Sequence, residues 1–298
     1  MKIKKAGSTT FPDTLREVRR VLWLVLGLNL TVCLGKLAVG VSVGSLSMVA
    51  DGFHSLMDSL ANGLGLMSVW IASKPPDKDH PYGHQKFEVL GAMGTAVFMG
   101  VACMEILSDA LRNLRTPGAL PHPNVLSFLV MGLTMGINGW TSWYESRKGR
   151  KLQSPLLKAD SAHNASDLLS SASVLGALAG AVIGWGWVDL AAALLVVAVV
   201  GKAAWDIVNQ AQQALADHIM VDPTRVARVV KSVPGILSCS KVRSRGMPGN
   251  VFVDLHIQVS PRLTNLKAHR LTHRVMETVK EAVPGVREVF VHTEPSRR

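Results

Sequence analysis

The chain has 298 residues, of which 48% are hydrophobic and 18% charged, and its formal net charge is +11. This length allows about two domains, and the composition is too apolar for an ordinary pair of soluble ones. The basic residues form no single stripe and are not interleaved with stacking aromatic residues, so we expect no nucleic-acid binding. We expect membrane spans instead, with the positive charge orienting the chain in a lipid bilayer.

Apolar runs dominate the first 210 residues and then stop. Each has roughly 18 or more residues, which is near the length needed to cross a bilayer core. The first run lacks the cleavage pattern of a secretory signal, so we expect it to stay in the membrane. We assign residues 1–20 to a cytoplasmic segment and 21–213 to a transmembrane domain. The six predicted spans are 21–40, 46–72, 87–111, 124–144, 160–184 and 187–210.

Lysine and arginine are unevenly distributed between these spans. They are concentrated in segments 16–20, 74–86 and 147–158, whereas the turns at 41–44 and 184–186 carry none. Because basic loops stay on the cytoplasmic side, we expect both termini to be cytoplasmic. The short loops and the lack of a targeting segment favour a bacterial inner membrane, with an organelle membrane as the alternative.

The second and fifth predicted spans share the pattern Ala-Asp-x-x-His-x-x-x-Asp. Its ionisable residues are Asp51, His54 and Asp58 in the first copy, and Asp160, His163 and Asp167 in the second. An ionisable group at membrane depth costs upward of ~2.5 kcal/mol, so these six need a partner or a function. The main cations inside the spans, Lys36 and Lys202, are too few to neutralise them.

Residues four apart lie on one face of a helix, so each copy offers a two-ligand clamp of histidine and aspartate. Two facing clamps, His54 with Asp58 and His163 with Asp167, supply two imidazole nitrogens and two carboxylate oxygens. That set suits tetrahedral Zn²⁺, whereas Mn²⁺ and Mg²⁺ prefer more oxygen. The alternative is that both histidines are hydrogen-bonded core residues and that the aspartates pair with lysines.

The remaining polar residues of these spans receive other interpretations. Asp51 and Asp160 lie near the faces of the clamps, but a four-coordinate site is already full. We interpret them as proton-pathway candidates, with helix packing or capping as the alternative. For Asn138 we expect a hydrogen bond between helices.

The connector after the second span contains Asp77, His80 and His84, which are close enough in sequence to converge on one ion. A solvated connector without a metal is the alternative.

The chemistry changes after Asp217, and we assign residues 214–298 to a soluble cytoplasmic domain. We expect a helix, two strands, a helix and a strand, an αββαβ order typical of a two-layer, ferredoxin-like α+β fold with one edge trimmed. The expected ranges are 223–232, 235–245, 251–259, 265–283 and 288–293. The widely spaced Cys33, Cys103 and Cys239 predict no disulfide framework.

Histidines are frequent in this tail. His256 lies in a predicted strand, His292 and Glu294 close the last strand, and His269 and His273 stand four apart on the last helix. A regulatory metal site is one interpretation, and histidines scattered over a small domain are the other.

Together these features resemble the cation diffusion facilitator family, which has six spans, HxxxD motifs on the second and fifth, and a cytoplasmic ferredoxin-like domain. The Tyr-Gly-His-x-Lys sequence that ends at Lys86 and the Val-His-Thr-Glu-Pro tail add to the resemblance. It implies a homodimer that is a transporter and not an enzyme, and that exports divalent metal in exchange for protons by alternating access. It also implies a transport site at the two clamps, a loop site at Asp77, His80 and His84, and a salt bridge between Lys86 and Asp217.

The resemblance also implies tail ligands at His256, His269, His292 and Glu294. A further family histidine, near the start of the first tail strand, is replaced here by Ser240. His54 at the first position of the clamp favours Zn²⁺ as the transported and regulatory ion. Transport of Fe²⁺, Mn²⁺, Cd²⁺ or Co²⁺, a metal sensor or scaffold without transport, an intramembrane metalloenzyme and an ion channel are the alternatives.

Overall fold

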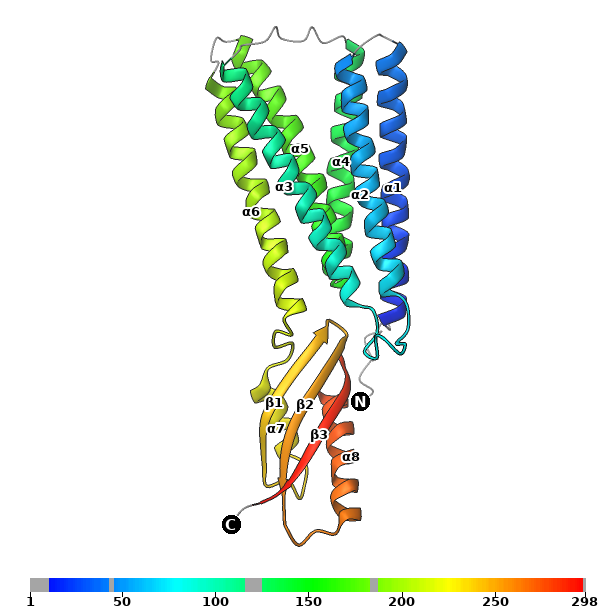
Figure 1. Cartoon of the computed structure of the whole chain (residues 1–298), viewed down its shortest axis with the longest axis vertical. Helices are drawn as coiled ribbons and strands as arrows, with labels where there is room; N and C mark the ends of the chain where they lie inside the picture. The colour runs from blue at the N-terminus through cyan, green and yellow to red at the C-terminus, as the bar shows by residue number, and fades with distance from the viewer. Residues whose placement is uncertain (1–10, 43–45, 116–124, 183–186, 297–298) are drawn as a thin grey trace, which may run out of the picture. The chain divides into compact units, whose positions relative to one another are not determined.

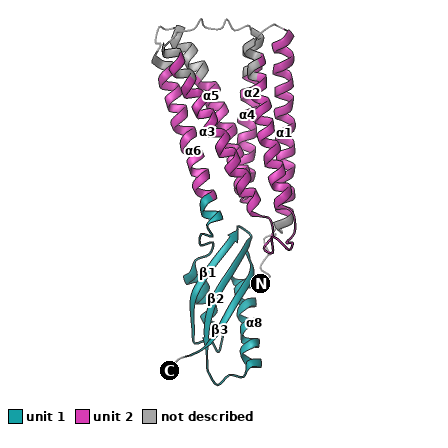
Figure 2. Ribbon diagram, viewed as in Figure 1, with its two compact units in different colours: residues 1–11, 212–298 teal, residues 12–211 magenta. Residues whose placement is uncertain are grey.

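The computed structural model describes residues 11–42, 46–115, 125–182 and 187–296. The chain divides into two compact units, residues 12–211 and residues 212–298 with 1–11 (Figure 2). The larger unit is helical, and the smaller unit combines helices with a sheet (Figure 1).

Six long helices build the larger unit, in agreement with the six predicted spans. In the described part of the chain, three segments are long and apolar enough to cross a membrane: Asp13–Ser42, Lys86–Ser108 and Leu190–Leu215. The other three helices are comparable in length, at 27 or 28 residues. The six are α1 (Phe11–Ser42), α2 (Leu46–Ala72), α3 (Lys86–Arg115), α4 (Val125–Leu152), α5 (Pro155–Val182) and α6 (Trp187–Leu215).

The connection between α4 and α5 is much shorter than the basic segment 147–158 predicted. α4 continues to Leu152, because Lys and Arg are good helix formers and basic residues in a last helical turn interact favourably with the helix dipole. α5 then starts at Pro155, a residue suited to a first helical position. The Ser154 hydroxyl accepts a hydrogen bond from the Leu157 amide and donates one to Glu88. The charged segment is therefore a tight helical hairpin.

Small and hydroxyl side chains bring the helices close together. The hydroxyls of Ser142 on α4 and Ser161 on α5 each donate to the other residue's carbonyl at 2.9 Å. A Cβ at Gly52 of α2 would lie 2.7 Å from the Leu37 side chain of α1, so a larger residue there would force Leu37 to shift. Such contacts hold helices together where the apolar surroundings give no hydrophobic drive.

The smaller unit has the predicted αββαβ order. Its sheet order is β1-β2-β3, with β1 and β2 antiparallel and β2 and β3 parallel. A β-hairpin joins the antiparallel pair, and α8 is the crossover that a parallel pair requires. The elements are α7 (Pro223–Lys231), β1 (Ser238–Met247), β2 (Asn250–Val259), α8 (Asn265–Ala282) and β3 (Val286–Pro295).

The core of this unit lies between the sheet and its two helices. Alternate residues of β2, among them Val253, Leu255 and Ile257, are buried in one cluster with Val230 of α7 and Val275 of α8. This is the period-two burial expected for a strand with one face covered. The sheet therefore buries one face under both helices, as the sequence predicts.

We expect Leu255→Ala to lower the free energy of unfolding of the smaller unit by about 2–5 kcal/mol, because it leaves a cavity in a packed core. Chemical denaturation of the segment 212–298, followed by circular dichroism, measures the change. Leu266→Ala is the matched control, since Leu266 is 59% exposed and Leu255 only 1%. Equal losses in the two variants would contradict this assignment of the core.

Candidate functional site

The second and fifth helices bring three of the predicted transport-site residues together. His163 Nε2 of α5 lies 3.4 Å from Asp58 Oδ1 of α2 and 3.9 Å from Asp167 Oδ2, one turn further along α5. The His163 side chain is 5% exposed, and the two aspartates are about 20% and 18% exposed. Ligand atoms of all three residues lie within 4.8 Å of one another. The HxxxD spacing of α5 and the last position of the α2 motif therefore converge on one point.

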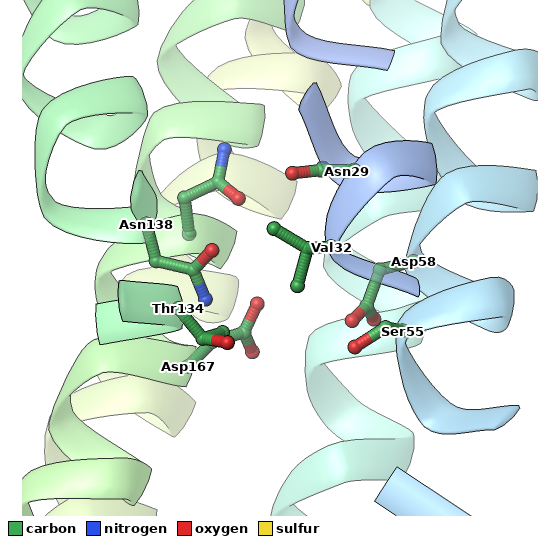
Figure 3. A pocket seen from close by; sticks show the side chains of 8 residues that line it. Asn29, Val32, Ser55, Asp58, Thr134, Asn138 and Asp167 are labelled. Atoms are coloured by element: carbon green, nitrogen blue, oxygen red, sulfur yellow. The ribbon is translucent and has the colours of Figure 1, made fainter. Parts of the chain in front are cut away.

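The ring nitrogens of His163 are not used in hydrogen bonds within the described part of the chain. Among the described residues, neither ring nitrogen of His163 has a hydrogen-bond partner, although both are buried. A small cavity of about 20 Å³ adjoins the cluster, large enough for one water-sized species. Figure 3 shows Asp58 and Asp167 on its wall with side-chain oxygens of their neighbours. An unpaired imidazole between two carboxylates is a donor set that fits a divalent transition-metal ion.

The cavity also has polar lining residues that the HxxxD pattern does not predict. Asn138, expected to bond between helices, lies on this wall. The other amide and hydroxyl residues of the lining are Asn29, Ser55, Thr134 and Asn164. Their oxygens are the hard ligands that Mn²⁺ and Mg²⁺ prefer. Asparagine and hydroxyl residues inside apolar helices are the sequence signal for them.

His54, the fourth predicted transport ligand, lies outside this cluster. It stands one turn before Asp58 on α2, and its side chain is exposed. Of the two predicted internal cations, Lys36 is near the cavity, since it donates a 3.0 Å hydrogen bond to the lining residue Ser55. Lys202 is exposed and pairs with Asp206 at 3.0 Å. The side chain of Asp51 lies outside the described residues.

Asp160 belongs to a second buried polar network, next to the cluster. With the Asn62 amide nitrogen facing Asp160, that nitrogen donates to Asp160 Oδ1 at 2.8 Å, and the Asn62 oxygen accepts from Asn29 at 2.7 Å. Asp160 also lies beside the fully buried Glu145 of α4, whose Oε2 atom accepts a hydrogen bond from Asn164 at 2.8 Å. Glu145 Oε1 is buried and has no hydrogen-bond partner among the described residues.

Glu145 is absent from the predicted site residues because it lies just beyond the predicted end of its span. There it has the sequence signature of a solvated charge at a membrane surface. The extension of α4 to Leu152 places it inside the helical unit instead. The only sequence signal for Glu145 is a weak one, a carboxylate two residues before the basic pair Arg147 and Lys148 near the end of the helix.

The predicted loop residues form a second cluster, between α2 and α3. Asp77 lies 3.4 Å from His80 Nδ1 and 3.3 Å from His84 Nε2. Backbone amides of His80 and Asp79 donate to Asp77 Oδ1, and the His80 hydrogen bond is the main reason that the pKa of Asp77 is below its usual value. His84 is buried, and its Nδ1 atom has no hydrogen-bond partner among the described residues. The turn therefore preorganises one carboxylate and two imidazoles.

The tail cluster contains three of the four predicted ligands. His256 Nδ1 lies 2.8 Å from Glu294 Oε1, and His292 Nε2 lies 3.8 Å from the same oxygen. The parallel register of β2 and β3 pairs His256 with His292 and Gln258 with Glu294, which explains this convergence. The hydrogen bond with His256 is the main reason that the pKa of Glu294 is lowered.

Other predicted tail and interface residues are placed differently. His269 lies on α8, exposed, with its ring 4.5 Å from that of His273 and outside the cluster. Ser240 is paired with His256 in the β1–β2 register, so the absent family histidine would stand beside the tail cluster. Lys86 starts α3 in the larger unit, and Asp217 follows α6 in the smaller unit with φ of 54°. Their salt bridge stays a prediction.

Comparisons with known proteins agree with this architecture. Residues 22–216 match the cation efflux transmembrane domain, and residues 220–296 match the cytoplasmic domain of cation efflux proteins. The chain is 30% identical to the cation-efflux pump FieF of Shewanella oneidensis, over 89% of this chain and 90% of the pump. It is 29% identical to metal tolerance protein 2 of Oryza sativa subsp. japonica, over 92% of this chain and 77% of that protein. It is 26% identical to the manganese efflux system protein MneS of Bacillus subtilis, over 87% of this chain and 89% of that protein.

Both matched domains lie in the family's order and together cover nearly the whole chain. The six helices, the small α+β unit and the carboxylate–histidine cluster on α2 and α5 are consistent with that match. The protein belongs to the cation diffusion facilitator family of multi-pass membrane cation efflux transporters.

Proposed function

We propose that this chain exports Zn²⁺ through the cluster of Asp58, His163 and Asp167, in exchange for protons. The observation that carries the proposal is the buried His163 ring, whose two nitrogens lack hydrogen-bond partners while two carboxylates stand within 4 Å. Without a bound cation this arrangement is costly in an apolar helical unit. A divalent ion joins the three side chains and removes that cost. His54 is the fourth ligand once its side chain turns toward Asp58, four residues along the same helix face.

Zinc is the preferred substrate because two imidazoles and two carboxylates match its tetrahedral N and O coordination. Manganese is the second candidate, for two reasons. Five amide and hydroxyl side chains line the adjoining cavity, and Mn²⁺ favours oxygen ligands. The similar protein MneS is named for manganese efflux.

Proton exchange follows from the chemistry of these ligands. Imidazole and carboxylate bind metal only when deprotonated, so protonation and metal binding exclude each other at one site. Histidine is suited to this exchange because its ordinary pKa is near physiological pH. Alternating access then allows metal to bind from the cytoplasm and protons to displace it on the other side. An inward proton gradient drives export.

We place both termini and residues 214–298 in the cytoplasm of a bacterial inner membrane, with residues 21–213 as the transmembrane domain. The lysine and arginine distribution supports this orientation. We also propose that the working unit is a homodimer. In it, the loop cluster of Asp77, His80 and His84 binds a second ion, and the tail cluster senses cytoplasmic metal. Differential metal binding by two states of the tail would shift the transport equilibrium.

We expect zinc flux in proteoliposomes to follow an imposed pH gradient and to fall to the level of empty vesicles in Asp58→Asn and Asp167→Asn. Each substitution removes an anionic ligand from the site and keeps the side-chain size. Asp206→Asn is the matched control, since Asp206 is an exposed carboxylate of α6 paired with Lys202. The fluorescence of a zinc-sensitive dye trapped inside the vesicles measures the flux.

Three outcomes of the flux assay would change the proposal. Faster transport of manganese than zinc would establish the second candidate. Flux that ignores the pH gradient and far exceeds transporter rates would indicate a channel. No flux of any divalent ion would indicate a sensor or scaffold.

The tail cluster generates a separate prediction. In His256→Ala/His292→Ala we expect activation of flux by zinc on the tail side to be lost, because two of the three clustered ligands are removed. Flux at saturating zinc should remain, since the membrane cluster is unchanged. His218→Ala/His273→Ala is the control, because neither histidine belongs to a three-ligand cluster among the described residues. An unaltered zinc dependence in the first double variant would refute metal sensing at this cluster.

The metal-free tail should also respond to pH. The pKa of Glu294 is lowered by its hydrogen bond with His256, so this interaction stabilises the fold above the ordinary pKa of a glutamate. It is lost as the pH falls through the lowered pKa. We expect His256→Phe to raise the pKa of Glu294 toward its ordinary value, as measured by the ¹³C shift of its carboxyl group in zinc-free protein. The shift should be unaffected by His273→Phe.

A further inference from the structure

A groove between α1 and α2 combines cations with an aromatic wall. Its volume is about 580 Å³, within the range of small-molecule sites. The Lys74 ammonium, just beyond α2, lies 4.3 Å from the centre of the Trp70 ring on the groove wall. None of these residues belongs to the three metal-ligand clusters. The groove is lined by Arg19, Arg20 and Trp23 of α1 and by Leu66, Met67 and Trp70 of α2.

The lining changes from charged to aromatic to aliphatic along the helix axes. Trp23 follows the arginines by three to four residues, which is roughly 5–6 Å deeper at 1.5 Å per residue. On the antiparallel helix α2, Trp70 lies four residues before Lys74, and Leu66 precedes it by one more turn. A phospholipid has the same order of polarity, from phosphate through the interfacial esters to the acyl chain. Tryptophan is typical of the interfacial level.

The cations at the mouth of the groove are not neutralised by neighbouring acids. The acidic residues closest in sequence are used elsewhere, Glu17 by Lys148 at 3.5 Å and Asp13 by Arg16 at 3.8 Å. Within the described ranges, neither Arg19 nor Arg20 forms an ion pair. Trp23 and Trp70 are 61% and 54% exposed, so the aromatic wall is also open. The groove therefore presents positive charge without an ion pair next to an exposed apolar surface.

We propose that this groove binds one anionic phospholipid, with its phosphate between Arg19 and Arg20 and an acyl chain along Trp23, Leu66 and Trp70. A zwitterionic lipid fits less well, because it would add an ammonium to three uncompensated cations. A free phosphate ion would satisfy the arginines but make no use of the aromatic and aliphatic wall. On the proposed orientation, the groove opens to the cytoplasmic leaflet, whose anionic lipids attract basic residues at about 1 kcal/mol each.

Native mass spectrometry of the full-length chain in detergent tests the proposal by titration with phosphatidylglycerol and, separately, phosphatidylcholine. We expect one phosphatidylglycerol per chain to bind in preference to phosphatidylcholine. Arg19→Gln/Arg20→Gln should weaken that binding roughly thirty-fold, the product of two charge losses. Arg150→Gln/Lys151→Gln is the matched control, since it removes two exposed cations from the last turn of α4, outside the groove.

Two further variants separate the contributions of charge and of apolar contact to lipid binding from an effect on folding. Arg19→Lys/Arg20→Lys should keep most of the binding, which shows that the loss in the glutamine variant comes from charge and not from misfolding. Trp70→Ala should weaken the binding of phosphatidylglycerol and leave the weak binding of inorganic phosphate unchanged. Equal binding of the two lipids, full competition by inorganic phosphate, or equal losses in the test and control pairs would overturn the proposal.

Discussion

The larger unit depends on one constraint: ionisable side chains inside apolar helices must be neutralised or hydrogen-bonded. α5 carries Asp160, His163 and Asp167 within two turns, so its surroundings decide whether the helix can lie there at all. The structure meets this demand in two ways. Asp160 lies beside Asn62 and Glu145, whereas His163 lies beside the carboxylates of Asp58 and Asp167. Asp160 is therefore hydrogen-bonded within the protein, whereas the ring nitrogens of His163 have no hydrogen-bond partner among the described residues.

This difference between neighbouring layers supports the proposed transport site on α2 and α5. A satisfied network of buried polar groups fixes helix positions, because an unpaired group in a medium of low polarity is costly. The network of Asn29, Asn62, Asp160 and Glu145 ties four helices together one turn from the metal-ligand cluster. That support holds the ligands of α2 and α5 within reach of each other. In the proposed mechanism, the cluster exchanges a metal ion for protons while this network holds the surrounding helices together.

The loop and tail clusters obey a milder form of the same constraint. Exposed Asp77 and partly exposed Glu294 lie near water, so their charges cost little and local hydrogen bonds suffice to lower their pKa values. Backbone geometry places the ligands in both cases. An Asx-type turn orients Asp77 toward His80, and the parallel register of β2 and β3 sets His256 beside His292. This arrangement suits the sensing and delivery proposed for these two clusters more than transport across the bilayer.

The sequence by itself determined the six helices, the αββαβ tail and the convergence within the HxxxD pair of α5, because these depend on periodicity and on spacing along one element. Only the tertiary structure decided which of these side chains meet. It placed His163 beside Asp58, left His54 and His269 outside the clusters, and buried Glu145 against Asp160. The physical reason is that spacing along a helix is fixed locally, whereas the rotation and depth of a helix are fixed by the neighbours it packs against.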